Sequence, residues 1–212
     1  MQTAFSRFAP EAVIEDVLEG APVDPVKREV TVLFADLKGF TSMSEELDPA
    51  VLVGMRTGYF RAMSRAISAH RGHVATFMGD GIMAIFGAPE HNPWQAKDAV
   101  AAALEMRRAL ASYNGELRAR GLPQLEFGVG VHLGSAVAGV IGSEQLVEFT
   151  VIGDTVNVAS RVESATRGHG VDILISDDVK RRLDDRVALR AVAPTPVKGK
   201  PEPLILWAVE RD

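Results

Sequence analysis

The chain has 212 residues, 47% of them hydrophobic and 24% charged, which is typical of a soluble globular protein and excludes intrinsic disorder. It has no cysteine, so disulfides, cysteine-ligated metals and thiol nucleophiles are excluded. The net charge of −5, with scattered basic residues, argues against a nucleic-acid partner. No apolar stretch approaches the roughly 20 residues that cross a membrane. We therefore expect a cytoplasmic domain, leaving open a full-length protein that is tethered to a membrane.

Residues 1–27 are expected to form an appendage in front of a main domain at residues 28–212. Pro10 and Gly20 bracket a predicted amphipathic helix. Pro22 and Pro25 mark a linker after it. This arrangement suggests coupling to an upstream sensor or regulatory domain.

The first half of the main domain alternates predicted strands and helices. The apolar run 28–36 predicts a strand buried on both faces, and Asp48-Pro49 predicts the start of a helix that ends near Gly72. Strands at 73–78 and 82–86 are joined by the turn Gly79-Asp80-Gly81. A long helix is expected over 94–120.

The second half is richer in strands. We expect strands at 125–132, 135–141 and 148–152, and then a helix at 155–166 with Asp154 as its cap. The tail predicts strands at 172–175, 187–192 and 204–209 and a short helix at 177–183. Because hairpins interrupt the βαβ pattern, this order predicts an α+β fold with helices against one face of an antiparallel or mixed sheet.

Two aspartates stand at strand ends. Asp36 ends the buried strand 28–36, and Asp80 lies at the tip of the hairpin. If these strands are neighbours, the two carboxylates repel each other unless one is protonated or a cation lies between them. Oxygen ligands without nearby histidine or cysteine favour Mg²⁺ or Mn²⁺. A lone aspartate before glycine is more often a turn residue, so the surrounding sequence decides between the two interpretations.

Three motifs surround these aspartates and a later helix. They are Phe34-Ala-Asp-Leu-Lys-Gly-Phe-Thr41, Phe77-Met-Gly-Asp-Gly-Ile-Met-Ala-Ile-Phe86 and Phe149-Thr-Val-Ile-Gly-Asp-Thr-Val-Asn-Val-Ala-Ser-Arg161. Together they resemble the catalytic domain of class III nucleotidyl cyclases, and the resemblance extends from about Glu29 to Trp207. It implies a ferredoxin-like core within the α+β fold and a homodimer whose active sites are shared between subunits. The predicted helix at 10–20 is similar to the transducer helix of bacterial members.

The resemblance also implies a metal and phosphate site. It assigns two Mg²⁺ or Mn²⁺ ions to Asp36 and Asp80, with the carbonyl of Leu37 as a further ligand. The backbone amides of the glycine-containing loop would contact the triphosphate, as a helix start with free amides can do. That loop is Leu37-Lys-Gly-Phe-Thr41, and its predicted substrate-binding residues are Gly39, Phe40 and Thr41.

Further site residues follow by the same resemblance. Asn157 would hold the ribose, and Arg161 would meet the charge that develops on the α-phosphate. Their spacing of four residues places both on one helix face. Lys198 and Lys200 are similar to a phosphate-contacting segment of the family, and which of the two contacts phosphate is left open.

The residues that select the purine depart from the family pattern. Adenine-specific members commonly carry a lysine four residues before the second metal aspartate and an aspartate seven before the asparagine, where this chain has Thr76 and Thr150. Threonine donates or accepts hydrogen bonds, so neither residue dictates a base. A bacterial subset with threonine at the position of Thr150 cyclises ATP, and the absence of glutamate at 76 argues against a guanylate cyclase. We therefore expect ATP to be converted to 3′,5′-cyclic AMP and pyrophosphate.

Alternative functions stay open. One is a guanylate or dual-specificity cyclase that uses GTP, and another is a catalytically silent cyclase-like module that regulates a partner by dimerising. The silent module predicts a missing metal or transition-state residue, and none is missing. A diguanylate cyclase or polymerase palm lacks support because the Gly-Gly-Asp/Glu-Glu-Phe signature is absent. The five histidines show no metal-ligand spacing and are assigned no catalytic role.

Overall fold

The structure, a computed structural model, describes residues 25–88, 90–143, 146–196 and 202–211. The predicted helix at 10–20 and both Lys198 and Lys200 lie outside these ranges. The strands are β1 Val26–Lys38, β2 His73–Met78, β3 Gly81–Phe86, β4 Glu126–Ser143, β5 Leu146–Ile152, β6 Ile173–Ser176, β7 Leu189–Ala191 and β8 Leu206–Val209. The helices are α2 Phe40–Glu46, α3 Pro49–Ala69, α4 Gln95–Ala119, α5 Asp154–His169 and α6 Asp177–Lys180. Within the described ranges, no helix is both long and apolar enough to span a membrane.

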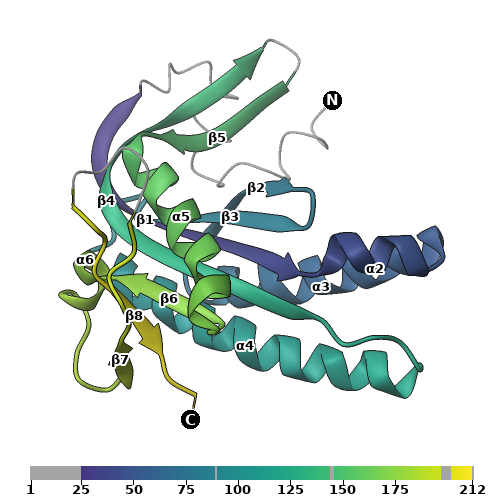
Figure 1. The fold of residues 1–212 in the computed structure, drawn as a ribbon. Helices are drawn as coiled ribbons and strands as arrows, with labels where there is room; N and C mark the ends of the chain where they lie inside the picture. The colour runs from purple at the N-terminus through teal and green to yellow at the C-terminus, as the bar shows by residue number, and fades with distance from the viewer. Residues whose placement is uncertain (1–24, 89, 144–145, 197–201, 212) are drawn as a thin grey trace.

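The strands form one mixed sheet in the order β2-β3-β1-β4-β6-β8-β7, with β5 paired to β4 (Figure 1). The first six major elements, β1-α3-β2-β3-α4-β4, have ferredoxin-like connectivity. Strand β1 lies between β3 and β4 and is antiparallel to both. Strand β6 joins β4 in parallel, and β8 and β7 extend the sheet beyond it. The α+β fold with a mixed sheet flanked by helices is therefore confirmed.

Helices cover both faces of this sheet. Helices α3 and α4 pack on one face, where β1 contributes Leu33 and Ala35 to the core. Helix α5 covers the opposite face, where β1 contributes Val30 and Val32 to a second cluster that includes Ala159 (Figure 1). The expectation that helices lie against one face is thus wrong for α5. The physical reason is that β1 is apolar on both sides, so both faces need a covering layer.

Other differences from the expected elements are local. The strands expected at 125–132 and 135–141 are one strand, β4, because Gly134 makes room for the side chain of Thr155 instead of forming a turn. Asp154 is the first residue of α5 and not its cap, a position held by Gly153. Helix α2 occupies part of the segment that we expected to be a loop leading towards a helix.

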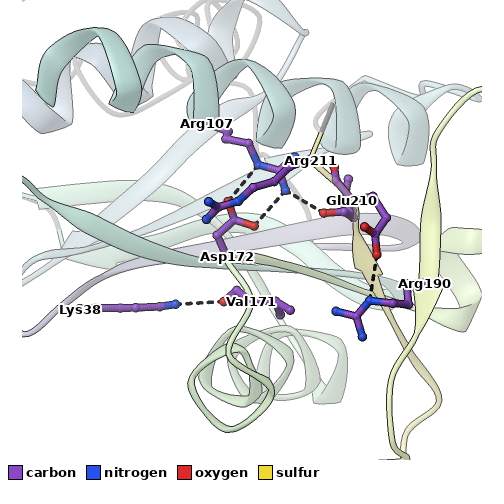
Figure 2. A network of polar contacts seen from close by, with 8 residues as sticks. Lys38, Arg107, Val171, Asp172, Arg190, Glu210 and Arg211 are labelled. Carbon is purple, nitrogen blue, oxygen red and sulfur yellow. Dashed lines mark hydrogen bonds and ion pairs between the residues drawn. The ribbon is translucent and has the colours of Figure 1, made fainter. Parts of the chain in front are cut away.

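A polar network ties α4 to the turn between α5 and β6 and to the end of β8 (Figure 2). Arg107 donates to both carboxylate oxygens of Asp172 at 2.9 Å and to the carbonyls of Val209 and Glu210 at 2.8 Å. Lys38, at the end of β1, donates to the carbonyl of Val171 in the same turn at 2.9 Å. The network therefore fixes the strand end that follows Asp36.

We expect Arg107→Ala to lower the free energy of unfolding by about 2 kcal/mol, because it removes both hydrogen bonds that Arg107 donates to the mostly buried carboxylate of Asp172 and leaves that carboxylate paired with the more exposed Arg211. The neighbouring Arg108 pairs with Glu105 on the exposed helix surface. The matched variant Arg108→Ala should therefore change stability by less than about 1 kcal/mol. Urea denaturation of both variants measures the difference, and equal losses would contradict a structural role of the network.

Candidate functional site

Strand β1 and the β2–β3 hairpin bring Asp36 and Asp80 to the same edge of the sheet. Ala35 pairs with Ile82, so Asp36 lies beside Gly81, where a Cβ would be 3.3 Å from its Oδ1 atom. Asp80 immediately precedes Gly81 in the turn. Burial, and then the negative charge of Asp36, raise the pKa of Asp80. The predicted meeting of the two carboxylates is therefore present in a single chain.

The loop that follows Asp36 ends in a helix start. Leu37 is buried in the core, and Gly39 adopts the left-handed conformation, with φ 69°, that glycine tolerates best. Phe40 packs against the core and begins α2. The backbone amides of the first helical turn, including that of Thr41, have no acceptor within the helix. These amides are the groups that the sequence predicts to contact phosphate.

The donors at this edge fit Mg²⁺ or Mn²⁺. Two carboxylates and a backbone carbonyl supply oxygen atoms only, and Mg²⁺ commonly takes one or two carboxylates together with substrate phosphates and water. In the part of the chain that the structure describes, no group of three acidic, histidine or cysteine side chains could hold a metal ion alone. Water or substrate oxygen atoms would therefore have to supply the remaining ligands of a cation held at this edge.

A cation of the chain itself already contacts this site. Arg167, in the last turn of α5, donates to Asp36 with 2.6 Å between Nη2 and Oδ2. Its other terminal nitrogen lies 3.6 Å from Oε1 of Glu163. Sequence reasoning missed Arg167, because an arginine four residues after a glutamate usually indicates a solvent-exposed helix pair.

Buried polar atoms lie behind the carboxylate pair. Among the described residues, the Tyr59 hydroxyl, Glu163 Oε1 and Thr166 Oγ1 are buried and have no hydrogen-bond partner. Burial and the charge of Asp36 raise the pKa of Tyr59. Burial also raises the pKa of Glu163, and the charge of Arg167 opposes this shift. The sequence signal for Glu163 was available, since it falls on the buried stripe of α5 beside Val162.

Asn157 and Arg161 lie on α5 away from this carboxylate pair. Asn157 is exposed and Arg161 is half-buried, and neither contacts another described residue through a hydrogen bond or ion pair. Helix α5 runs antiparallel along β4, with Thr155 near Gly134 at one end and Thr166 near Gly128 at the other. Asn157 is therefore about 15 Å along the helix from Arg167, which contacts Asp36. A single chain does not bring the two predicted halves of the site together.

The two threonines at the predicted purine positions lie on strands that meet. Thr76 is half-buried on β2 and Thr150 is half-buried on β5. The ring of His73 on β2 contacts the ring of Phe149 on β5 edge-on, with 6.0 Å between centroids. The strands that carry the two predicted base-selecting positions thus meet, in the part of the sheet where the β4–β5 arm projects (Figure 1).

Comparison with known proteins identifies the family of similar sequences. The family described as "Adenylate and Guanylate cyclase catalytic domain" matches residues 23–210. Adenylate cyclase 1 of Rhizobium meliloti (strain 1021) is 35% identical over 183 residues, which cover 86% of this chain and 28% of that protein. The chain therefore spans less than a third of the length of this curated relative.

Solved structures are also similar. The guanylyl cyclase Cya2 superposes with a TM-score of 0.80 at 39% identity, covering 87% of this chain and 93% of that one. The adenylyl cyclase CyaB from P. aeruginosa superposes with a TM-score of 0.83 at 30% identity, covering 90% of this chain and 97% of that one. The fold is thus shared with solved structures of both an adenylyl and a guanylyl cyclase.

Proposed function

The chain belongs to the adenylate and guanylate cyclase catalytic domain family, and from that premise we propose that it converts ATP to 3′,5′-cyclic AMP and pyrophosphate at sites shared by a homodimer. The observation that carries the proposal is the meeting of Asp36 and Asp80 beside the start of α2. An upstream sensor or regulatory domain, coupled through residues 1–27, is part of the same proposal.

The reaction needs no protein nucleophile. The ribose 3′-oxygen forms a bond to the α-phosphorus and gives up its proton to water. The bond between the α-phosphorus and the oxygen that bridges to the β-phosphorus breaks, and that oxygen leaves as part of pyrophosphate. Two Mg²⁺ or Mn²⁺ ions bound by Asp36, Asp80 and the Leu37 carbonyl would lower the pKa of that hydroxyl and neutralise the departing pyrophosphate. The amides of Gly39, Phe40 and Thr41 would hold the phosphates.

Side chains of the second chain complete this site in the proposal. Asn157 would orient the ribose, and the guanidinium of Arg161 would stabilise charge on the α-phosphate as the new bond forms. The distance along α5 between Asn157 and Arg167 supports a shared site, because one chain alone leaves its Asn157 and Arg161 remote from its own carboxylates. Lys198 or Lys200 would add a phosphate contact.

ATP is the proposed substrate, and GTP is the specific alternative. The similarity to an adenylate cyclase of Rhizobium meliloti and to CyaB favours ATP, whereas Cya2 is a guanylyl cyclase at 39% identity. Neither Thr76 nor Thr150 excludes either purine, because a threonine hydroxyl both donates and accepts.

Product analysis with purified protein tests this proposal. ATP and GTP are supplied in parallel, each with Mg²⁺ and with Mn²⁺, and cyclic products are separated from linear ones. We expect cyclic AMP with a clear preference for ATP. Comparable cyclic GMP would reassign the protein as a guanylate or dual-specificity cyclase. No cyclic product from a demonstrated dimer would favour the silent module.

Replacing both threonines should sharpen the preference for adenine. In the variant Thr76→Lys with Thr150→Asp, lysine donates to adenine N1 and aspartate accepts from the exocyclic amine, so the ratio of ATP to GTP turnover should rise about tenfold. The kcat/KM values for both nucleotides measure this ratio. A control that changes an exposed threonine on α3, Thr57→Lys, should leave this ratio unaltered. An unchanged ratio in the double variant would remove these positions from the base-binding site.

A further inference from the structure

The guanidinium of Arg167 lies between two carboxyl groups of very different burial. It donates to Asp36 at 2.6 Å, whereas Oε1 of Glu163 is 3.6 Å away, which is too long for a hydrogen bond. The Arg167 side chain is 45% exposed and the Glu163 side chain only 8%. In the described part of the chain, Glu163 Oε1 accepts no hydrogen bond at all. The other carboxylate oxygen of Glu163, Oε2, accepts from the hydroxyl of Ser164 at 3.3 Å. Arg167 therefore satisfies Asp36 and leaves Oε1 of the buried Glu163 without a donor.

The surrounding packing fixes Glu163 but not Arg167. Helix α5 crosses β4 so closely that a Cβ on Gly130 would overlap the backbone of Glu163, and one on Gly128 would lie 2.9 Å from its Oε1. The carboxyl of Glu163 thus has little room to move. Arg167 lies in the last turn of α5 with its side chain 45% exposed, so its guanidinium is less confined than the carboxyl of Glu163. A buried acceptor without a donor favours a hydrogen bond whenever the donor becomes free.

We propose that Arg167 is a positioning residue that competes with divalent cations for Asp36, and that Glu163 receives its guanidinium when that carboxylate binds a metal ion. The inference rests on the proposed function, because it takes Asp36 and Asp80 as the metal ligands. Without a metal ion, Arg167 neutralises one of two carboxylates that would otherwise repel each other. On metal binding, Arg167 breaks its bond to Asp36 and completes the hydrogen bond to Glu163, so the buried oxygen gains a partner.

Two variants should shift metal affinity in opposite directions. Arg167→Gln removes the competitor for Asp36 and should tighten Mn²⁺ binding about three- to five-fold. This factor corresponds to the free energy that a partly exposed ion pair contributes. Glu163→Gln makes the alternative partner weaker and should loosen Mn²⁺ binding by a similar factor. If Glu163 acts through Arg167, its substitution should have little further effect in the Arg167→Gln background. A merely structural role for either residue would not produce this coupling.

Mn²⁺ titration of the full chain without nucleotide, with free Mn²⁺ followed by electron paramagnetic resonance, measures these affinities. Arg167→Lys keeps the positive charge but lacks the planar guanidinium group. Its Mn²⁺ affinity should therefore lie between that of the wild type and that of Arg167→Gln. Arg181→Gln removes the same charge from the exposed arginine that follows α6 and pairs with Asp177, and it should leave Mn²⁺ binding unchanged.

The outcomes separate this inference from the proposed function. If Asp80→Ala removes Mn²⁺ binding but Arg167→Gln and Arg167→Lys bind Mn²⁺ as wild type does, the competition is disproved and the metal site stands. If Asp80→Ala binds Mn²⁺ normally, the proposed metal site is wrong and the inference is overturned with it.

Discussion

Asp80→Ala is expected to reduce metal-dependent cyclase turnover by about 10³-fold or more, because it removes one of the two carboxylates that hold the cations over the phosphates. The variant should fold normally. Burial and the negative charge of Asp36 raise the pKa of Asp80 in the folded chain. Above that pKa the ionised carboxylate of Asp80 is less stable in the folded chain than in the unfolded one, so it does not stabilise the fold at neutral pH. Asp80→Ala should therefore unfold at no lower temperature than the wild type when metal is absent.

Two measurements check this prediction together. Turnover is assayed with Mn²⁺ and ATP, and thermal unfolding is followed with and without Mn²⁺. We expect Mn²⁺ to raise the melting temperature of the wild type and not that of Asp80→Ala. Asp185→Ala, which changes an exposed aspartate distant in sequence from the motifs, should match the wild type in both assays. Activity retained by Asp80→Ala would rule out the two-carboxylate site.

The fold was largely predictable because its strands and helices have strong periodicity. The doubly buried strand 28–36, the capped helix after Asp48 and the hairpin around Asp80 all correspond to elements of the structure. The opposite faces covered by α3 and α5 were not predicted, since periodicity identifies an apolar side of a helix without naming the sheet face that it meets. The continuous strand β4 was missed for a related reason, because Gly134 accommodates a crossing helix and does not break the strand.

The site was predictable where residues occur in motifs and not where contacts are tertiary. The sequence predicted that Asp36 and Asp80 would meet because each stands at the end of a strand, and the structure brings them together. The contact of Arg167 with Asp36 joins residues 131 positions apart, so no local pattern could indicate it. The hydrogen bond from Lys38 to the carbonyl of Val171 could not be predicted either, because a lysine after a buried strand is usually solvated. Both contacts depend on how α5 and its following turn lie on the sheet.

Mixing two inactive variants is expected to restore about a quarter of wild-type activity, because each active site takes its halves from different chains. Asp36→Ala lacks a metal carboxylate but keeps Arg161, and Arg161→Ala keeps both carboxylates. Random exchange makes about half of the dimers mixed, and each mixed dimer has one intact site out of two. Cyclic nucleotide formation by each variant alone and by an equimolar mixture measures the rescue.

The matched control combines two defects on the same half of the site. Mixed dimers of Asp36→Ala and Asp80→Ala lack a carboxylate in both sites, so no activity should return. Rescue in the first mixture but not in the second requires that Arg161 of one chain acts beside Asp36 and Asp80 of the other. Absence of rescue in both, with mixed dimers demonstrated, would place the whole site in one chain. Helix α5 would then have to move by about 9 Å, the length between Arg161 and Arg167, to bring Arg161 to the position that Arg167 occupies beside Asp36.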